Sequence, residues 1–230
     1  MIAAASKAVK LYLAPVLAFT ATLLSLLAFL APSVLLHSQV SLISVGPSTE
    51  KSAPTILMGA LGSCSRPNDK SPFKCTTPSL SPAYDLSALP SNTPHIISSP
   101  TSATPVFILI SLIFTSTFLF MFTLFSLRSK LGSALSARLD SPFAHRAVAW
   151  LGLLGFMIGL TAFLVLRMWF GKSVDDFNVG ISELGNAAPA IVASVGNGFK
   201  MIYAAYAFLA VPVVLSLSEL HTKTGSKSAA

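Results

Sequence analysis

Charged residues are scarce in this chain. Asp, Glu, Lys and Arg make up only 10% of its 230 residues, whereas soluble domains carry about 25%. Hydrophobic residues make up 53%, and the mean hydropathy is +0.74. This composition excludes an ordinary soluble domain and indicates a membrane protein. The formal charge of +7 is spread thinly, without a basic run, so it does not point to nucleic acid.

Residue patterns that support chemistry are also missing. No phosphate-binding loop, nucleophile elbow or zinc-protease motif occurs, and the histidines neither pair at helical spacing nor form a Cys/His cluster in the sequence. The long apolar runs contain no central Asp, Glu or His, which a proton relay or an ion path usually needs. We therefore expect no enzyme, no cofactor and no metal site. A small transporter or channel is the less favoured alternative. The four histidines are His37, His95, His145 and His221.

Four apolar runs reach the length of about 20 residues that a membrane-spanning helix needs. They predict spans at residues 11–36, 104–127, 147–170 and 199–217. The expected fold is therefore an all-α membrane protein built on a four-helix transmembrane bundle.

The distribution of charge predicts the orientation of these spans. Lys and Arg outnumber the acids in residues 1–10, 128–146 and 218–230, whereas most acids lie in residues 37–103 and 171–198. Basic segments stay on the cytosolic side of a membrane. We therefore expect both termini to be cytosolic and the other two loops to face the outside of the cell or a secretory lumen. The resemblance given below implies the plasma membrane.

The first outer loop contains the only two cysteines, Cys64 and Cys75, separated by a polar, turn-forming insert. Because this loop faces an oxidising side in the predicted topology, we expect a disulfide rather than two free thiols. Short β-prone runs at residues 40–45, 55–58 and 73–76 predict a small antiparallel sheet that the disulfide clamps.

The rest of the outer loops gives weaker patterns. Residues 77–105 are rich in Ser, Thr and Pro, which fits either an O-glycosylated stalk or an unmodified loop draped over the sheet. In the second outer loop, Ser173 followed by Asp175 and Asp176 predicts a helix start. The apolar run at 186–198 predicts either a surface helix or an early start of the fourth span.

The third span contains a GxxxG pair, Gly155 and Gly159. Such a pair lets another helix approach closely, either one of the same bundle or one of a second molecule. Aromatic and basic residues near the ends of the spans suit the membrane–water interface. These expected anchors are Trp150, Trp169, Arg167 and Lys200.

Two short motifs carry a resemblance. Leu61-Gly62-Ser63-Cys64 is followed by Cys75, and Asn197-Gly198-Phe199 leads into an aromatic, Ala-rich fourth span. With the four spans and the two unequal outer loops, this pattern resembles the fungal Sur/PalI family of claudin-like tetraspan membrane proteins. The first outer loop lacks the Trp that animal claudins carry before the first Cys. The short tail departs from those members with long cytosolic C-termini.

The resemblance implies a function as well as a fold. It implies a non-enzymatic protein that organises a cortical membrane domain, the eisosome or cortical patch, and supports cell-wall integrity. The alternative that it implies is a PalI-type accessory subunit of an ambient-pH sensing complex. The implied partners are membrane lipids, other membrane proteins or further copies of the chain, and the cell wall or a larger pH sensor.

Overall fold

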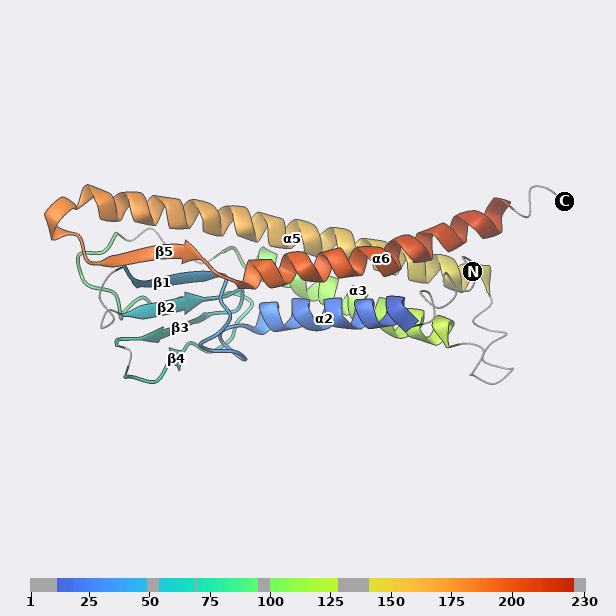
Figure 1. Ribbon diagram of the computed structural model, residues 1–230, viewed down its shortest axis with the longest axis horizontal. Coiled ribbons are helices and arrows are strands. Elements are labelled where there is room, and N and C mark those ends of the chain that lie inside the picture. Colours follow the sequence, from blue (N-terminus) through green and yellow to red (C-terminus); the bar gives the residue numbers. More distant parts are fainter. Residues whose placement is uncertain (1–11, 49–53, 69, 95–99, 128–140, 226–230) are drawn as a thin grey trace. The chain divides into compact units, whose positions relative to one another are not determined.

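The computed structural model describes residues 12–48, 54–68, 70–94, 100–127 and 141–225. Within these residues the chain forms four long helices and one five-stranded antiparallel sheet (Figure 1). The predicted cytosolic segment 1–10, most of the predicted cytosolic loop 128–146 and the last residues of the tail lie outside the described residues.

Three of the four helices are long and apolar enough to cross a membrane, namely α3, α5 and α6. The remaining helix, α2, is equally apolar but has only 17 residues. The prediction of a membrane protein is confirmed, while the fourth span stays a prediction. The helices are α2 (Ala14–Leu30), α3 (Ala103–Ser126), α5 (Pro142–Glu183) and α6 (Gly198–Gly225).

The chain divides into two compact units. The first comprises Met1–Ser25, Leu109–Leu160 and Tyr203–Ala230, and the second comprises Leu26–Ile108 and Thr161–Ile202. The first unit consists of parts of α2, α3, α5 and α6, and the second contains the whole sheet.

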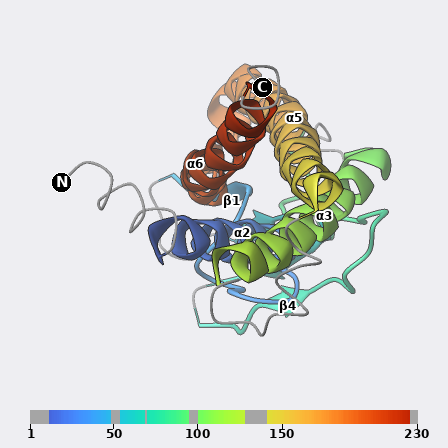
Figure 2. The ribbon, with the colours of Figure 1, turned by 90° about the vertical axis from the view of Figure 1, so that its right-hand side faces the viewer.

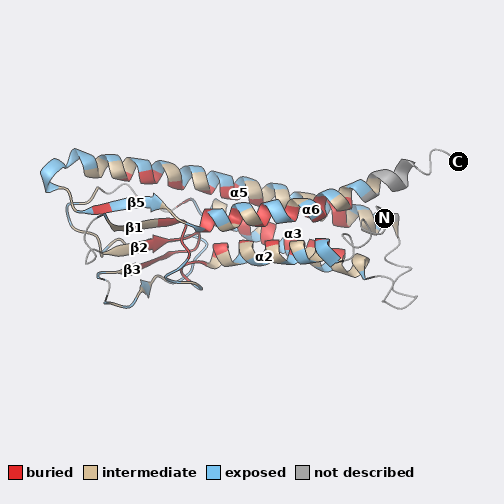
Figure 3. Ribbon diagram, in the orientation of Figure 1, coloured by how far each residue is buried: buried red, intermediate tan, exposed pale blue. Residues whose placement is uncertain are grey.

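The helices of the first unit lie side by side (Figure 2). Their buried positions hold small and aromatic residues, and exposed positions along the same helices (Figure 3) hold large apolar ones. An apolar surface of this extent is unfavourable in water but natural against lipid tails. Examples of these side chains are Phe19, Ile113, Phe120, Met157 and Val214, at 57, 56, 63, 53 and 62% exposure.

The sheet of the second unit has the strand order β4-β3-β2-β1-β5, and each neighbouring pair is antiparallel. Four strands come from the segment between α2 and α3, and the fifth comes from the segment between α5 and α6. The predicted small antiparallel sheet is confirmed, although β3 and β5 were not predicted as strands. The strands are β1 (Ile43–Pro47), β2 (Thr55–Met58), β3 (Ser63–Arg66), β4 (Lys74–Cys75) and β5 (Ile191–Val195).

The predicted helix start at Ser173 is wrong, because α5 runs without a break from Pro142 to Glu183. The Ser173 hydroxyl donates to the carbonyl of Trp169, one turn earlier, as a serine inside a helix does. At 1.5 Å per residue, the 42 residues of α5 correspond to roughly 63 Å of helix, about twice the thickness of a bilayer core.

The two predictions for residues 186–198, a surface helix or an early fourth span, are also wrong. This stretch forms the 3₁₀ turn η3 (Gly185–Ala187), the strand β5 and the first residue of α6. β5 pairs with β1 in the register Ser44 to Ser194. Its hydrogen-bonding partner therefore lies about 150 residues earlier in the chain, and the local sequence pattern does not reveal it.

Candidate functional site

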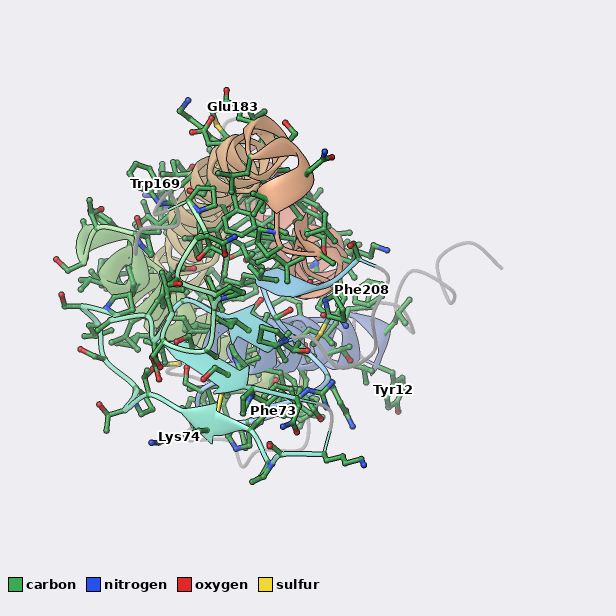
Figure 4. All side chains as sticks on the ribbon, turned by 90° about the vertical axis from the view of Figure 1, so that its left-hand side faces the viewer. Tyr12, Phe73, Lys74, Trp169, Glu183 and Phe208 are labelled. Atoms are coloured by element: carbon green, nitrogen blue, oxygen red, sulfur yellow. A yellow bond between two sulfur atoms is a disulfide. The ribbon has the colours of Figure 1, made fainter. Side chains whose placement is uncertain are left out.

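The predicted disulfide is present between β3 and β4. Cys64 and Cys75 face each other directly in the strand register, with their Cα atoms 4.0 Å apart and their sulfurs bonded. Phe73 and Lys74 of the same hairpin lie beside this bond in Figure 4. The guanidinium of Arg66 stands 4.9 Å from the centre of the Phe73 ring, a cation–π contact that also joins β3 to β4.

A histidine that sequence reasoning did not connect to the cysteines lies against the disulfide. The Nδ1 atom of His37 is 3.5 Å from Cys75 Sγ and 3.9 Å from Cys64 Sγ, and it donates a hydrogen bond of 2.5 Å to the carbonyl of Pro32. In the folded chain His37 therefore lies beside both sulfurs, which the disulfide joins, while the expectation of no metal site stays a prediction.

His37 is placed by the turn that follows α2. Leu36 has a positive φ of 56°, and its carbonyl accepts the backbone N–H groups of Gln39 and Val40. This turn brings the imidazole back over the sheet. His37 precedes Cys64 by 27 residues and Cys75 by 38, so no motif spacing could have revealed the contact.

The Leu61-Gly62 motif serves the packing of the β2–β3 turn. Leu61 is 7% exposed, and the N–H of Gly59 donates to the carbonyl of Gly62. A β-carbon on Gly62 would lie 2.5 Å from Thr76 Oγ1, and one on Gly59 would collide with the carbonyl of Ala31. Both glycines therefore let the turn lie close to its neighbours in the second unit.

Residues 77–94 form a loop that is bonded to the sheet region, which favours the draped-loop alternative over a free stalk. The buried Tyr84 hydroxyl donates to the carbonyl of Gly59 at 2.7 Å, and the N–H of Asp85 donates to Ser63 Oγ at 2.9 Å. Burial raises the pKa of Tyr84 far above its usual value, so the phenol stays protonated and keeps donating. Hydrogen bonds from Ser87 lower the pKa of the Asp85 carboxyl.

The outer edge of β5 is covered by an asparagine of α5. The Asn178 amide accepts a hydrogen bond from Ala193 N–H and donates one to the Ala193 carbonyl, both at 2.9 Å. The side chain therefore replaces a neighbouring strand at this edge residue. Phe170, Val174 and Phe177 are buried at helical spacing on the same part of α5.

An asparagine also fixes the chain between β5 and α6. The side chain of Asn197 accepts from the N–H of Ser41 at 3.3 Å and donates to the carbonyl of Gln39 at 2.7 Å. The Asn197-Gly198-Phe199 motif therefore ties the start of α6 to the strand-side end of the turn that holds His37. Phe199 is 2% exposed and packs edge-to-face on Phe170.

The GxxxG pair is used inside the bundle of the first unit. A β-carbon on Gly155 would lie 3.0 Å from the Thr115 side chain, and one on Gly159 would collide with Ser111 and with the hydroxyl of Tyr206. Ser111 Oγ donates to the Gly155 carbonyl at 2.7 Å. Of the two predicted partners, a helix of the same chain therefore meets this pair, with Ser111 and Thr115 on α3 and Tyr206 on α6.

The predicted interface anchors are aromatic and basic side chains with partial or full exposure. Trp150 is 57% exposed, and Trp169, which is labelled in Figure 4, is 45% exposed. The guanidinium of Arg167 lies 5.6 Å from the centre of the Phe199 ring, so this half-buried cation has a contact within the protein. Lys200 is exposed at the start of α6. The role of these four residues at the headgroup layer stays a prediction.

The site that emerges is a small sheet closed by a disulfide, with an imidazole against the sulfurs and strands from two distant segments. Its groups are a disulfide, an imidazole and polar side chains. No protein-family model matches the chain, and no curated protein matches it either.

Proposed function

We propose that the protein is a four-span membrane protein of the claudin-like plan that works by assembly. Its termini lie in the cytosol and its sheet lies outside the plasma membrane. In this proposal it organises a cortical membrane domain of the eisosome type through lateral contacts of the bundle and outer contacts of the sheet. It does so without catalysis.

The observation that carries this proposal is the composition of the sheet. β1 to β4 precede α3, whereas β5 follows α5, yet all five strands share one sheet. Two helices long enough to cross a membrane, α3 and α5, lie between them in the chain. Two crossings return the chain to the side where it began, so the sheet requires both of its segments on one side of the membrane.

The disulfide supports placing that side outside. Disulfides persist in secretory and extracellular compartments and are rare in the cytosol. The Cys64–Cys75 bond lies in the sheet, and the basic excess of residues 128–146 and 218–230 supports the same orientation.

Exposed side chains support a role in contacts. The sheet carries Ser44 and Ser194, whose hydroxyls bond to each other at 2.8 Å on the exposed face, and Val192 is 43% exposed. Lys74 is exposed on the edge strand β4. Non-obligate interfaces are about as polar as the rest of a protein surface, so a face of this composition is compatible with reversible contacts.

The experiment is localisation of the fluorescently tagged full chain in living fungal cells, followed by crosslinking and identification of co-purified proteins. Stable, immobile surface patches that contain wall or cortical-patch proteins are the expected result. An endosomal or diffuse signal, with a larger multi-span protein as the main crosslinked partner, would instead favour the pH-sensing alternative and contradict the cortical role.

A matched control compares the β4 edge with another exposed lysine of the same unit. Lys74→Ser changes the exposed edge of β4, whereas Lys172→Ser changes an exposed lysine on α5 that pairs with Asp176 at 3.4 Å. If the β4 edge takes part in the outer contacts, only Lys74→Ser reduces crosslinking.

A further inference from the structure

We propose that His37, Cys64 and Cys75 form a zinc site when the disulfide is reduced. Strands β3 and β4 are then linked either by the disulfide bond or by a bound zinc ion. The proposal does not depend on the proposed function. It rests on the placement of one imidazole nitrogen and two sulfurs, all within 4.8 Å of one another.

The donor set suits zinc. Two cysteine thiolates and one histidine are among the usual ligands of this ion, with Zn–S distances of about 2.3 Å and Zn–N distances of about 2.0–2.1 Å. A tetrahedral ion with these bond lengths places the nitrogen about 3.6 Å from each sulfur. His37 Nδ1 already lies 3.5 Å from Cys75 Sγ and 3.9 Å from Cys64 Sγ, so these distances match, and the imidazole has to turn Nδ1 from the Pro32 carbonyl toward the ion.

The sulfurs must separate, and the fold allows one of them to move. A tetrahedral zinc ion holds two thiolates about 3.8 Å apart. Cys64 is fully buried in β3, between two neighbouring strands. Cys75 is half-buried on β4, which has two residues and lies at the edge of the sheet. Cys75 is therefore the sulfur that moves outward, while Cys64 keeps its position.

The imidazole must also offer a lone pair at Nδ1. This nitrogen donates to the Pro32 carbonyl in the disulfide-bonded form. Zinc binding moves the imidazole proton to Nε2, and because His37 is exposed, solvent can exchange that proton. The fourth coordination position is left to water, as in zinc sites with three protein ligands.

Conversion of the disulfide to the zinc site takes two chemical steps. A trialkylphosphine reduces the disulfide: the sulfur–sulfur bond breaks, water supplies two protons and one oxygen, and two thiols and a phosphine oxide form. Zinc then binds as both thiols lose their protons, which pass to solvent. In the cell, the newly made chain with its thiols not yet oxidised is the form that can take the ion.

The test uses the full chain, purified in detergent with an affinity tag that contains no histidine. The oxidised and phosphine-reduced forms are titrated with zinc in competition with a coloured chelator. The expected result is about one zinc ion per reduced chain and none bound with comparable affinity by the oxidised chain. Equal zinc binding by the two forms would overturn the proposal.

Variants separate this site from two thiols acting alone. His37→Ala should weaken zinc binding at least tenfold, and Cys75→Ser should abolish it. His145→Ala is the matched control, because His145 stacks on Phe125 in the other unit, and it should bind like the wild type. Binding by His37→Ala that equals the wild type would refute the role of the imidazole.

A spectroscopic measurement tests the site in the wild-type chain, so its result does not depend on whether a variant folds. Cobalt(II) in the reduced chain should give sulfur-to-metal charge-transfer bands and the intense visible bands of tetrahedral coordination, and zinc should remove both. Zinc should also protect two thiols from a maleimide. Cobalt binding without charge-transfer bands would show coordination away from the cysteines and would overturn the proposal.

Discussion

Gly59 lies where a side chain has no room. A β-carbon at this position would collide with the carbonyl oxygen of Ala31 and lie 2.6 Å from Pro32 Cδ, whereas one at Gly46 would lie 4.0 Å from its nearest neighbour, Thr55 Cγ2. We expect Gly59→Ala to lower the midpoint of thermal unfolding by several degrees, because backbone atoms must shift. Gly46→Ala should stay close to the wild type.

The measurement is thermal unfolding of both variants in the same detergent, with tryptophan fluorescence as the signal. Equal midpoints for Gly59→Ala and Gly46→Ala would contradict the close approach of the β2–β3 turn to the chain after α2.

The disulfide leads to a second prediction at the scale of single residues. Cys64→Ser and Cys75→Ser should each destabilise the sheet by about 3 kcal/mol, the chain-entropy value for so short a loop. The double variant should be no worse than either single one, because the first substitution already removes the bond. Surface abundance and thermal unfolding measure the effect, and additive losses would argue that the cysteines act separately.

Single residues also show how far the sequence could predict the site. The cysteine pair was predictable because the two residues are close in sequence and the charge pattern places them on an oxidising side. Gly62 was recognised as part of a motif, but its reason, the neighbouring Thr76 side chain, needs the folded chain. His37 could not be connected to the sulfurs, because the turn at Leu36 brings it there.

At the scale of elements, α3 and α5 fit together through glycines of one helix and larger side chains of the other. Gly155 faces Thr115, and Gly159 faces Ser111. We expect Gly159→Leu and Gly155→Leu to lower the yield and thermal stability of the folded protein, because a leucine would force the helices apart. Thr161→Leu places the same leucine side chain at an exposed position of α5 and should have little effect.

We would compare the three variants by size-exclusion chromatography, for the yield of folded protein, and by the midpoint of thermal unfolding. Wild-type behaviour of Gly159→Leu would remove the packing role of the GxxxG pair. A loss as large in Thr161→Leu would show that added bulk anywhere on the helix is harmful.

The edge of β5 gives another prediction for an element. Asn178→Ala should cost about 1–3 kcal/mol, because the N–H and carbonyl of Ala193 lose their partners. Asn178→Asp keeps an acceptor for the N–H and should have an intermediate effect. Ser182→Ala, on an exposed residue of the same helix, is the control.

Denaturation of the detergent-solubilised variants, together with light scattering, tests this role. The uncovered edge should also increase aggregation of Asn178→Ala. An Asn178→Ala protein that unfolds and scatters like Ser182→Ala would contradict the covering role of the amide.

Elements differ in how well sequence patterns define them. The long helices were predictable because each is encoded by its own continuous apolar run. β5 was not, since its strand conformation depends on β1 and on Asn178, neither of which is local. The prediction of a helix start at Ser173 was wrong for a related reason. Cap-like residues do not end a helix whose next turns, with Val174 and Phe177, are buried by tertiary packing.

At the scale of the whole molecule, the number of crossings decides the position of each terminus. The sheet joins segments on either side of α3 and α5 in the chain, so these two helices together make an even number of crossings. In the proposed topology α6 also crosses the membrane, which predicts a C-terminus on the side opposite the sheet. The N-terminus reaches that same side only if α2, with its 17 residues, also spans the membrane.

Single introduced cysteines test this topology, because both native cysteines are held in the disulfide. Lys172→Cys, at an exposed position of α5, should react with a membrane-impermeant maleimide on intact cells. Ser133→Cys and Ser228→Cys should react only after permeabilisation, and so should Ser6→Cys if α2 spans the membrane. The wild-type chain is the background control.

Each pattern of labelling has its own meaning. Labelling of Ser228→Cys on intact cells, with Lys172→Cys protected, would invert the orientation and place the disulfide in a reducing compartment. Labelling of Ser6→Cys together with Lys172→Cys on intact cells would mean that α2 does not span and that the bundle has three crossings. Labelling of Lys172→Cys alone would establish four crossings, because only a spanning α2 puts both termini opposite the sheet.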